Sequence, residues 1–193
     1  MTGRLRVLIA EDETIIRMDL REMLEEEGYE VMEAADGDAA VAIAREAAPD
    51  LVILDIKMPG RDGLSAAKEI AADRIAPVLI LTAYSQRELI ARASEAGAMG
   101  YLVKPFQKTD LLPAIEIARG RYEQFIALAA EVGDLTERLE TRKLIDRAKG
   151  RLMDTYRLPE GDAFRFLQKA AMEKRVSMKE IAERVLDGSL EAG

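Results

Sequence analysis

The chain has 193 residues, of which 49% are hydrophobic and 33% are charged, and this composition is typical of a folded globular protein rather than a disordered one. It contains no cysteine and no histidine, which excludes disulfides, thiolate metal sites, imidazole metal ligands and the usual general base. Any chemistry must therefore use carboxylates, hydroxyl groups, lysine and a hard cation.

The net charge of −8 is unevenly distributed along the chain. Residues 1–120 hold 14 Lys and Arg against 22 Asp and Glu, whereas residues 121–193 hold 14 of each kind. Within the second part, residues 141–179 hold 11 basic and 5 acidic residues. An acidic half followed by a locally basic segment indicates two different tasks. No apolar run approaches the roughly 18–20 residues that span a bilayer, and the first residues lack a signal-peptide layout, so we expect a cytoplasmic protein without a membrane partner.

The first 120 residues alternate short apolar runs with amphipathic stretches. The runs lie at residues 7–10, 31–32, 51–54, 78–81 and 101–103. They are continuous rather than alternating, which is typical of strands covered by helices on both faces. Gly28, Asp36, a capping-box pattern at residues 85–88 and Gly97 mark helix ends between them. Five strands alternating with helices predict a doubly wound α/β domain with a parallel sheet over residues 1–120.

From Thr109 onwards the pattern becomes helical. Five apolar residues form a heptad-like seam with steps of 3, 4, 3 and 4, at Phe125, Leu128, Val132, Leu135 and Leu139. Such a seam is suited to packing on a partner helix. We expect residues 121–140 to be a helical linker and residues 141–193 to form three helices. A break is expected at residues 158–161, and Ser177 with Glu180 is expected to start the last helix.

Polar side chains follow four of the predicted strands, and they are Glu11 and Asp12, Asp55, Thr82, and Lys104. The carboxyl ends of parallel strands meet at one edge of a sheet. Clustered carboxylates require a neutralising cation, and oxygen ligands favour Mg2+. Asp55 can then attack phosphorus as a nucleophile, while Lys104 and Thr82 stabilise the phosphoryl oxygens. One acidic residue after a strand would be ordinary, but four complementary strand ends argue for a site.

Residues 5–120 resemble the receiver domain of two-component signalling. The resemblance is carried by Glu11-Asp12-Glu13, Asp55 with Met58-Pro59 and Asp62-Gly63, Thr82-Ala83, and Tyr101 followed by Lys104-Pro105-Phe106. It implies a flavodoxin-like (βα)5 fold with strand order 2-1-3-4-5. It also implies Mg2+ held by Glu11, Asp12, Asp55 and the backbone carbonyl of Lys57.

The same resemblance implies that a sensor histidine kinase transfers a phosphoryl group to Asp55. In the implied switch, Thr82 moves toward the phosphate and Tyr101 turns inward. Lys57 and Tyr84 each lie two residues after a residue of the site and are less typical of the family. Because these positions flank the phosphate, the two residues bear on the lifetime of the phosphorylated form.

Residues 141–186 resemble the ANTAR domain, the RNA-binding output of AmiR/NasR-type antitermination regulators. The residues that carry this resemblance are Ala148-Lys149-Gly150, Leu152-Met153, Ala163-Phe164, Leu167, Ala170-Ala171-Met172, Arg175 and Ala182. The family implies three helices that bind RNA stem-loops and prevent a transcription terminator from forming.

Candidate RNA contacts in this segment are chosen mainly because basic side chains neutralise phosphates, and they are Arg147, Lys149, Gly150, Arg165, Lys169 and Arg175. Tyr156 or Phe164 could stack on an unpaired base. Phe164 and Phe166 cannot both face one core stripe, so we expect one of them to be more exposed. Basic residues also commonly do no more than solvate helix faces.

A phosphorylation-controlled antiterminator that binds RNA stem-loops, as a homodimer on activation, is the leading interpretation. Two other outputs stay open. One is a DNA-binding transcription factor, since helix-turn-helix readers are also small helical units. The other is a protein-interaction output without nucleic acid. We expect no enzyme activity beyond phosphoryl acceptance and slow dephosphorylation, since no Gly-rich phosphate loop is present.

Overall fold

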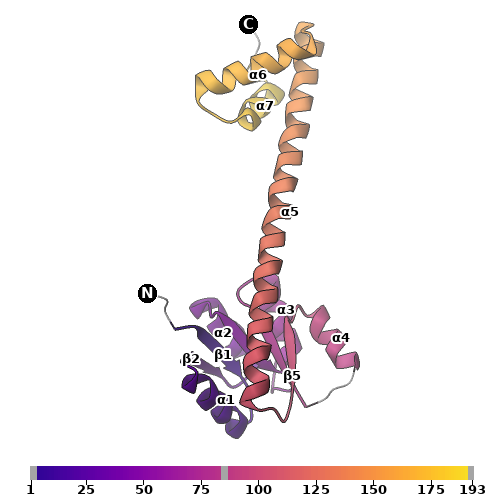
Figure 1. Cartoon of the computed structure of the whole chain (residues 1–193). Coiled ribbons are helices and arrows are strands. Elements are labelled where there is room, and N and C mark those ends of the chain that lie inside the picture. Colours follow the sequence, from indigo (N-terminus) through magenta and orange to yellow (C-terminus); the bar gives the residue numbers. More distant parts are fainter. Residues whose placement is uncertain (1–3, 84–86, 191–193) are drawn as a thin grey trace. The chain divides into compact units, whose positions relative to one another are not determined.

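The computed structural model describes residues 4–83 and 87–190, and the chain divides into two compact units, residues 1–126 and 127–193. The first unit alternates strands and helices along the chain (Figure 1): β1 (Arg6–Ala10), α1 (Thr14–Glu26), β2 (Glu30–Ala34), α2 (Gly37–Ala47), β3 (Leu51–Asp55), α3 (Gly63–Ala72), β4 (Val78–Thr82), α4 (Arg87–Glu95) and β5 (Gly100–Val103). Helix α5 (Lys108–Tyr156) follows and continues into the second unit.

The five strands form one parallel sheet in the order β2-β1-β3-β4-β5. The register pairs Ala10 with Leu54 and Asp55 with Leu81, so neighbouring strands end at the same edge. The predicted flavodoxin-like order is therefore confirmed. A parallel sheet of this kind needs cover on both faces, and the continuous apolar runs supply side chains to both.

Alternate residues of each central strand enter two separate cores. Leu8, Val52 and Ile80 lie in a core with residues of α2, α3 and α4. Ile9 and Ile53 lie in the other core, with residues of α1 and the first turns of α5. This division follows from the period of two in a strand, which sends successive side chains to opposite faces.

Several predicted helix ends are confirmed. Gly28 and Gly97 have φ values of 84° and 83°, which a glycine adopts without strain. Asp36 caps α2 by accepting a hydrogen bond from the Ala39 amide at 2.8 Å. Tyr84 lies outside the described residues, and so does the start of the capping-box pattern, at Ser85 and Gln86.

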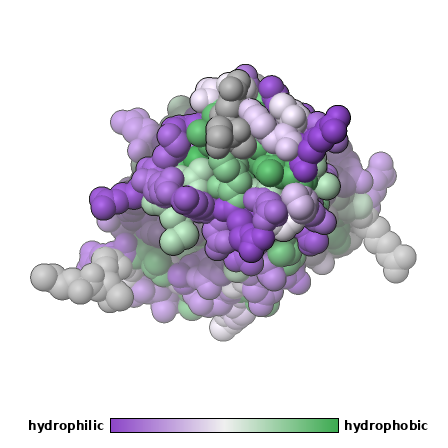
Figure 2. Space-filling model, turned by 90° about the horizontal axis from the view of Figure 1, so that it is seen from above, coloured by the Kyte–Doolittle hydropathy of each residue, from purple (hydrophilic) through white to green (hydrophobic). Residues whose placement is uncertain are grey.

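The second unit is built by the end of α5 with α6 (Glu160–Lys174) and α7 (Met178–Asp187). Its core contains Leu152, Leu167, Ile181 and Val185, each at most 2% exposed. Figure 2 shows hydrophobic residues gathered in the middle of the face seen there, with hydrophilic residues around them. The helical break is at residues 157–159, so the predicted break at 158–161 overlaps it, although Glu160 and Gly161 already belong to α6. Ser177 caps α7 by accepting a hydrogen bond from the Glu180 amide at 3.2 Å.

The long helix affects how the chain can be divided. Helix α5 has 49 residues and continues through positions 120 and 140 without a break. The boundaries that the sequence places at these positions stay a prediction. Among the described residues, no helix combines the length and the apolarity needed to cross a membrane.

Gly63 tests how closely α3 must approach β3. A Cβ atom at Gly63 would lie 1.8 Å from the backbone oxygen of Asp55. We expect Gly63→Ala to lower the free energy of unfolding by about 1–3 kcal/mol, because the start of α3 must move. At Gly120, which lies within helix α5, a Cβ would meet nothing within 4 Å. Gly120→Ala should therefore raise the free energy of unfolding by about 0.5–1 kcal/mol. Urea unfolding followed by circular dichroism measures both, and equal stability of the two variants would contradict this packing.

Candidate functional site

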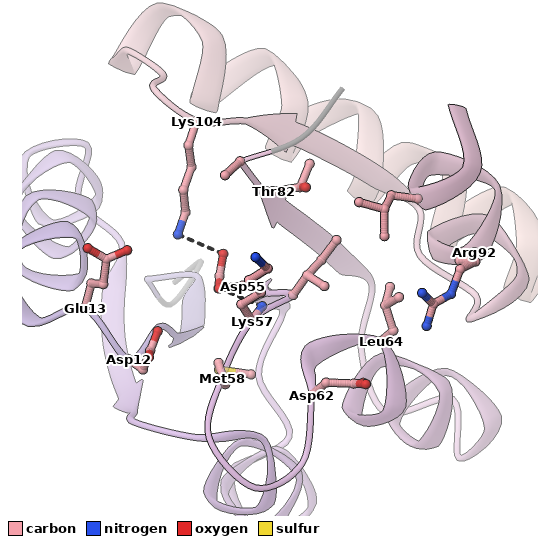
Figure 3. Close-up of a pocket in the computed structure, with 13 residues that line it drawn as sticks. Asp12, Glu13, Asp55, Lys57, Met58, Asp62, Leu64, Thr82, Arg92 and Lys104 are labelled. Atoms are coloured by element: carbon pink, nitrogen blue, oxygen red, sulfur yellow. Dashed lines mark hydrogen bonds and ion pairs between the residues drawn. The ribbon is translucent and has the colours of Figure 1, made fainter. Parts of the chain in front are cut away.

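The residues predicted to form a site come from four strand ends of the sheet (Figure 3). Glu11 and Asp12 follow β1, Asp55 ends β3, Thr82 ends β4, and Lys104 follows β5. The structure brings these residues together at the carboxyl edge, where such ends meet in an open α/β sheet. The peptide bond between Lys104 and Pro105 is cis.

Three carboxylates and one ammonium group form the centre of this site. Oxygens of Glu11, Asp12 and Asp55 all lie within 4.8 Å of one another. The Nζ of Lys104 lies 2.6 Å from Oε2 of Glu11 and 2.8 Å from Oδ1 of Asp55. The backbone amide of Lys57 donates a hydrogen bond to Oδ2 of Asp55 at 2.8 Å. Both oxygens of Asp55 are thus fixed by positively polarised groups.

Burial makes the electrostatics of these side chains strong. Glu11, Asp55 and Thr82 are the buried polar residues of the described chain, with exposures of 0%, 5% and 3%. Burial raises the pKa of Glu11, and the hydrogen bond from Lys104 opposes this rise only in part. Burial alone would lower the pKa of Lys104, but hydrogen bonds to Asp55 and Glu11 outweigh it and the pKa is raised. Lys104 therefore stays an ammonium group at neutral pH.

The donor set fits a small hard cation. Three carboxylates supply oxygen ligands at close quarters, and Asp12 is exposed, which leaves an ion there in contact with water. Mg2+ prefers oxygen ligands and usually keeps several waters, so it matches this arrangement. Above the cluster lies an open cavity of about 770 Å3 that reaches Thr82 and Ala83, large enough to admit a phosphorylated group.

Two of the predicted residues occupy less central places. Lys57 lines the cavity, and its backbone carbonyl as a metal ligand stays a prediction. Tyr101 lies on β5 with 45% of its surface exposed and does not line the cavity. Its side chain is therefore in an outward position, and its inward turn in the expected switch stays a prediction.

The cavity also contains residues that the sequence did not single out as members of the site. Arg92 of α4 reaches it beside Leu64 of α3 (Figure 3). Asp62 caps α3 through the Ser65 amide at 2.7 Å, and this bond lowers the pKa of Asp62. The Asp62-Gly63 pair was a readable helix start. The position of Arg92 had no signal in the sequence, since it depends on how α4 packs.

The candidate RNA contacts of the second unit differ in availability. Lys149 forms ion pairs with Asp146 at 2.8 Å and Glu160 at 2.9 Å, and only 16% of its side chain is exposed. Lys149 therefore connects α5 to α6 through ion pairs and is less suited to binding an RNA phosphate.

The other five candidates are more accessible or lack a charge. Arg165 pairs with Asp162, and Lys169 lies 3.7 Å from Glu173, yet both side chains are more than three-quarters exposed. Arg147 and Arg175 are exposed, and Gly150 has open space beside it. Phe164 is 42% exposed whereas Phe166 packs on the core, which confirms that one phenylalanine lies outside it.

The raised pKa of Glu11 leads to a pH-dependent effect of Mg2+. Mg2+ at about 100 times its Kd should stabilise the fold by about 2.7 kcal/mol at neutral pH. Folded Glu11 takes up its proton at a higher pH than unfolded Glu11, so lowering the pH stabilises the metal-free fold and weakens metal binding. The increase in melting temperature with Mg2+ should therefore shrink toward acid pH.

Thermal unfolding with and without Mg2+ across the pH range measures this increment. Glu11→Gln should reduce it at neutral pH, whereas Glu22→Gln, on the exposed face of α1, should leave it unchanged. An increment that grows toward acid pH would contradict the arrangement.

Comparisons with known proteins agree with these observations. The model of the response regulator receiver domain matches residues 7–116, and that of the ANTAR domain matches residues 133–186. Chemotaxis protein CheY of Halobacterium salinarum is 44% identical over 111 residues, which are 57% of this chain and 92% of that protein. Chemotaxis protein CheY4 of Vibrio cholerae has a solved structure with a TM-score of 0.58 and 34% identity, covering 60% of this chain and 99% of that one.

One relative is similar over both units. Transcriptional regulatory protein PdtaR of Mycobacterium tuberculosis is 60% identical over 183 residues, which are 94% of this chain and 89% of that protein. The similarity thus extends across the sheet, the long helix and the terminal helices. The chain belongs to the two-component response regulators and joins a receiver domain to an ANTAR domain.

Proposed function

We propose that Asp55 accepts a phosphoryl group from a sensor histidine kinase, and that this step controls RNA binding by the ANTAR unit in transcription antitermination. The observation that carries the first half is the placement of Lys104 between Glu11 and Asp55, beside Asp12. A buried carboxylate beside an ammonium group and two further acids is suited to phosphoryl acceptance in the presence of a metal ion.

Each residue of the site has a separate part in this transfer. An oxygen of Asp55 attacks phosphorus as the bond from phosphorus to the imidazole nitrogen of the kinase breaks, so that an aspartyl phosphate forms. Glu11, Asp12, Asp55 and the backbone carbonyl of Lys57 would hold Mg2+. The ion offsets charge on the phosphoryl oxygens when it is bound. A CheY of Borrelia burgdorferi, 29% identical over 59% of this chain, was solved in a complex that contains Mg2+ and a beryllium fluoride.

Lys104 and Thr82 are placed to stabilise the aspartyl phosphate once it has formed on Asp55. Phosphorylation adds charge of about −1.5 to −2, and the Lys104 ammonium is already in place to bind it. The Thr82 hydroxyl lines the same cavity and would donate a hydrogen bond to a phosphoryl oxygen. As Thr82 moves, Tyr101 turns from its exposed position into the space behind it. This is the switch that we assign to the receiver.

Helix α5 is fastened to the first unit near this switch. Arg121 donates a hydrogen bond to the carbonyl of Met99 at 3.0 Å, directly before β5. Tyr122 donates one to the carbonyl of Arg74 at 2.7 Å, and the guanidinium of Arg74 lies 6.0 Å from the ring centre of Phe125. A change at β5 therefore has a short route to the helix that continues into the ANTAR unit.

A phosphorylation assay tests both halves of the proposal. With Mg2+ and a small-molecule phosphodonor, the full chain should gain one phosphoryl group by intact-protein mass spectrometry. Asp55→Asn should gain none, whereas Asp19→Asn, an exposed residue of α1, should behave as the unchanged chain. Phosphorylation of Asp55→Asn to the same extent would refute the assignment.

The output is measured on the same samples. Phosphorylated chain should bind hairpin RNA more tightly than Asp55→Asn, and more tightly than it binds duplex DNA at the same salt concentration. Tighter binding to duplex DNA would support a DNA-binding output instead. Absence of binding to either nucleic acid would support a protein-interaction output.

The seam on α5 supports a dimer of the activated form. Its five apolar side chains are 44% to 61% exposed, and they are Phe125, Leu128, Val132, Leu135 and Leu139. Covering each of them would contribute about 1.5–3 kcal/mol at most, which favours a second copy of the same helix along this face. Two linked RNA-binding units would then bind two stem-loops with higher avidity than one.

Charged residues in the seam test the dimer. We expect the double variant Leu128→Glu, Leu135→Glu to keep the phosphorylated chain monomeric in sedimentation velocity, because like charges would face each other across the helix pair. Ala130→Glu places a charge at an exposed position of α5 that does not belong to the seam, and it should leave the dimer intact. A phosphorylated wild-type chain that stays monomeric, even with RNA present, would refute this part of the proposal.

A further inference from the structure

The second unit contains a groove that the phosphorylation chemistry does not use. It has a volume of about 540 Å3 and lies between α5 and the N-terminal part of α6. The residues of α5 that line it come from the stretch 134–149, and α6 contributes Phe164. Its volume falls within the range of about 300–1,000 Å3 that is usual for small-ligand sites.

Phe164 is the unusual member of this groove. Its ring is 42% exposed, although the neighbouring aromatic residues Tyr156 and Phe166 pack against the core of the unit. Phe164 and Ile145 are the apolar residues of the lining. An exposed aromatic ring at the mouth of a groove offers a flat face on which a base can stack.

The charged residues around the ring are suited to a nucleotide. Arg138 pairs with Asp134 at 2.9 Å and Lys149 with Asp146 at 2.8 Å, whereas Arg142 forms no ion pair among residues 4–83 and 87–190. Arg142 is exposed and attracts the Asp146 carboxylate only from beyond ion-pair distance, so among the cations of the lining it is the most available for a phosphate. The carboxylates of the lining accept hydrogen bonds, as the amino group of a base would require.

We propose that this groove binds one unpaired base of an RNA loop, stacked on Phe164, with an adjoining phosphate held by Arg142. The inference rests on the proposed RNA-binding function and assigns the residues that read the loop. A paired base cannot present its face to a side chain, so the groove selects a loop over a stem. A second copy of the chain fits less well, because six of the nine residues that line the groove are charged, and charged residues are depleted at the cores of protein interfaces.

The test uses the full chain and a hairpin RNA selected on it from a pool with a randomised loop. Stacking on an aromatic side chain contributes about 1–3 kcal/mol per base, so Phe164→Ala should weaken binding roughly 5- to 150-fold. Phe164→Tyr should stay within about threefold of wild type, because it keeps the ring. Phe164→Leu should lose about as much as Phe164→Ala.

Two controls isolate stacking from other effects. Met172→Ala removes an apolar side chain on α6 that is 73% exposed and does not line the groove, and it should not change RNA affinity. A second set of RNAs has its loop nucleotides replaced one at a time by abasic sites. At one position, the abasic site should weaken RNA binding by the wild-type chain but should not weaken it further for Phe164→Ala. That position holds the base that stacks on Phe164.

The possible results separate the two proposals. If wild type binds no hairpin from the pool, the RNA function and the groove assignment both fail. If wild type binds the hairpin, and either Phe164→Ala or Phe164→Leu binds it as tightly as wild type does, the groove assignment fails and the RNA function stands. If Phe164→Ala changes the association state in sedimentation, the groove is occupied by a second copy and the assignment is overturned.

Discussion

The structure depends on how the carboxylates at the edge of the sheet are neutralised. Two like charges about 4 Å apart repel by about 4 kcal/mol at the effective dielectric constant of about 20 that describes protein sites. Glu11 and Asp55 are buried beside Asp12, so this repulsion has to be offset within the fold. Lys104 supplies one positive charge through its ion pairs with Glu11 and Asp55, and a cation bound to the oxygen ligands would supply more. The same cluster therefore sets both the stability of the edge and its reactivity.

Much of this arrangement could be predicted from the sequence. Continuous apolar runs at residues 7–10 and 51–54 determined that the strands are covered on both faces, and a parallel sheet then brings its carboxyl ends together. Asp55 and Lys104 lie 49 positions apart in the chain, yet both follow from counting strand ends. The predicted site is compact because Asp55 and Thr82 end strands, and Glu11, Asp12 and Lys104 lie only one or two residues beyond strand ends.

Other features depend on packing between helices and had no readable signal. The sequence offers Lys149 as a basic residue, but its side chain is neutralised by Asp146 and by Glu160 across the break between α5 and α6. Arg92 enters the cavity only because of the way α4 lies over the sheet. The pattern required one exposed phenylalanine, and only the packing of α6 selects Phe164 over Phe166. Charge counts therefore identify a basic segment without showing which cations are free.

On phosphorylation, we expect Lys104 to pass from the carboxylates to the phosphoryl group on Asp55. A crystal structure of the full chain with Mg2+ and beryllium fluoride measures this directly. We expect beryllium bonded to an oxygen of Asp55, Mg2+ beside Asp12, and Nζ of Lys104 turned from Glu11 to a fluorine atom. A beryllium fluoride bound elsewhere, or a Lys104 still paired with Glu11 beside an occupied Asp55, would contradict it.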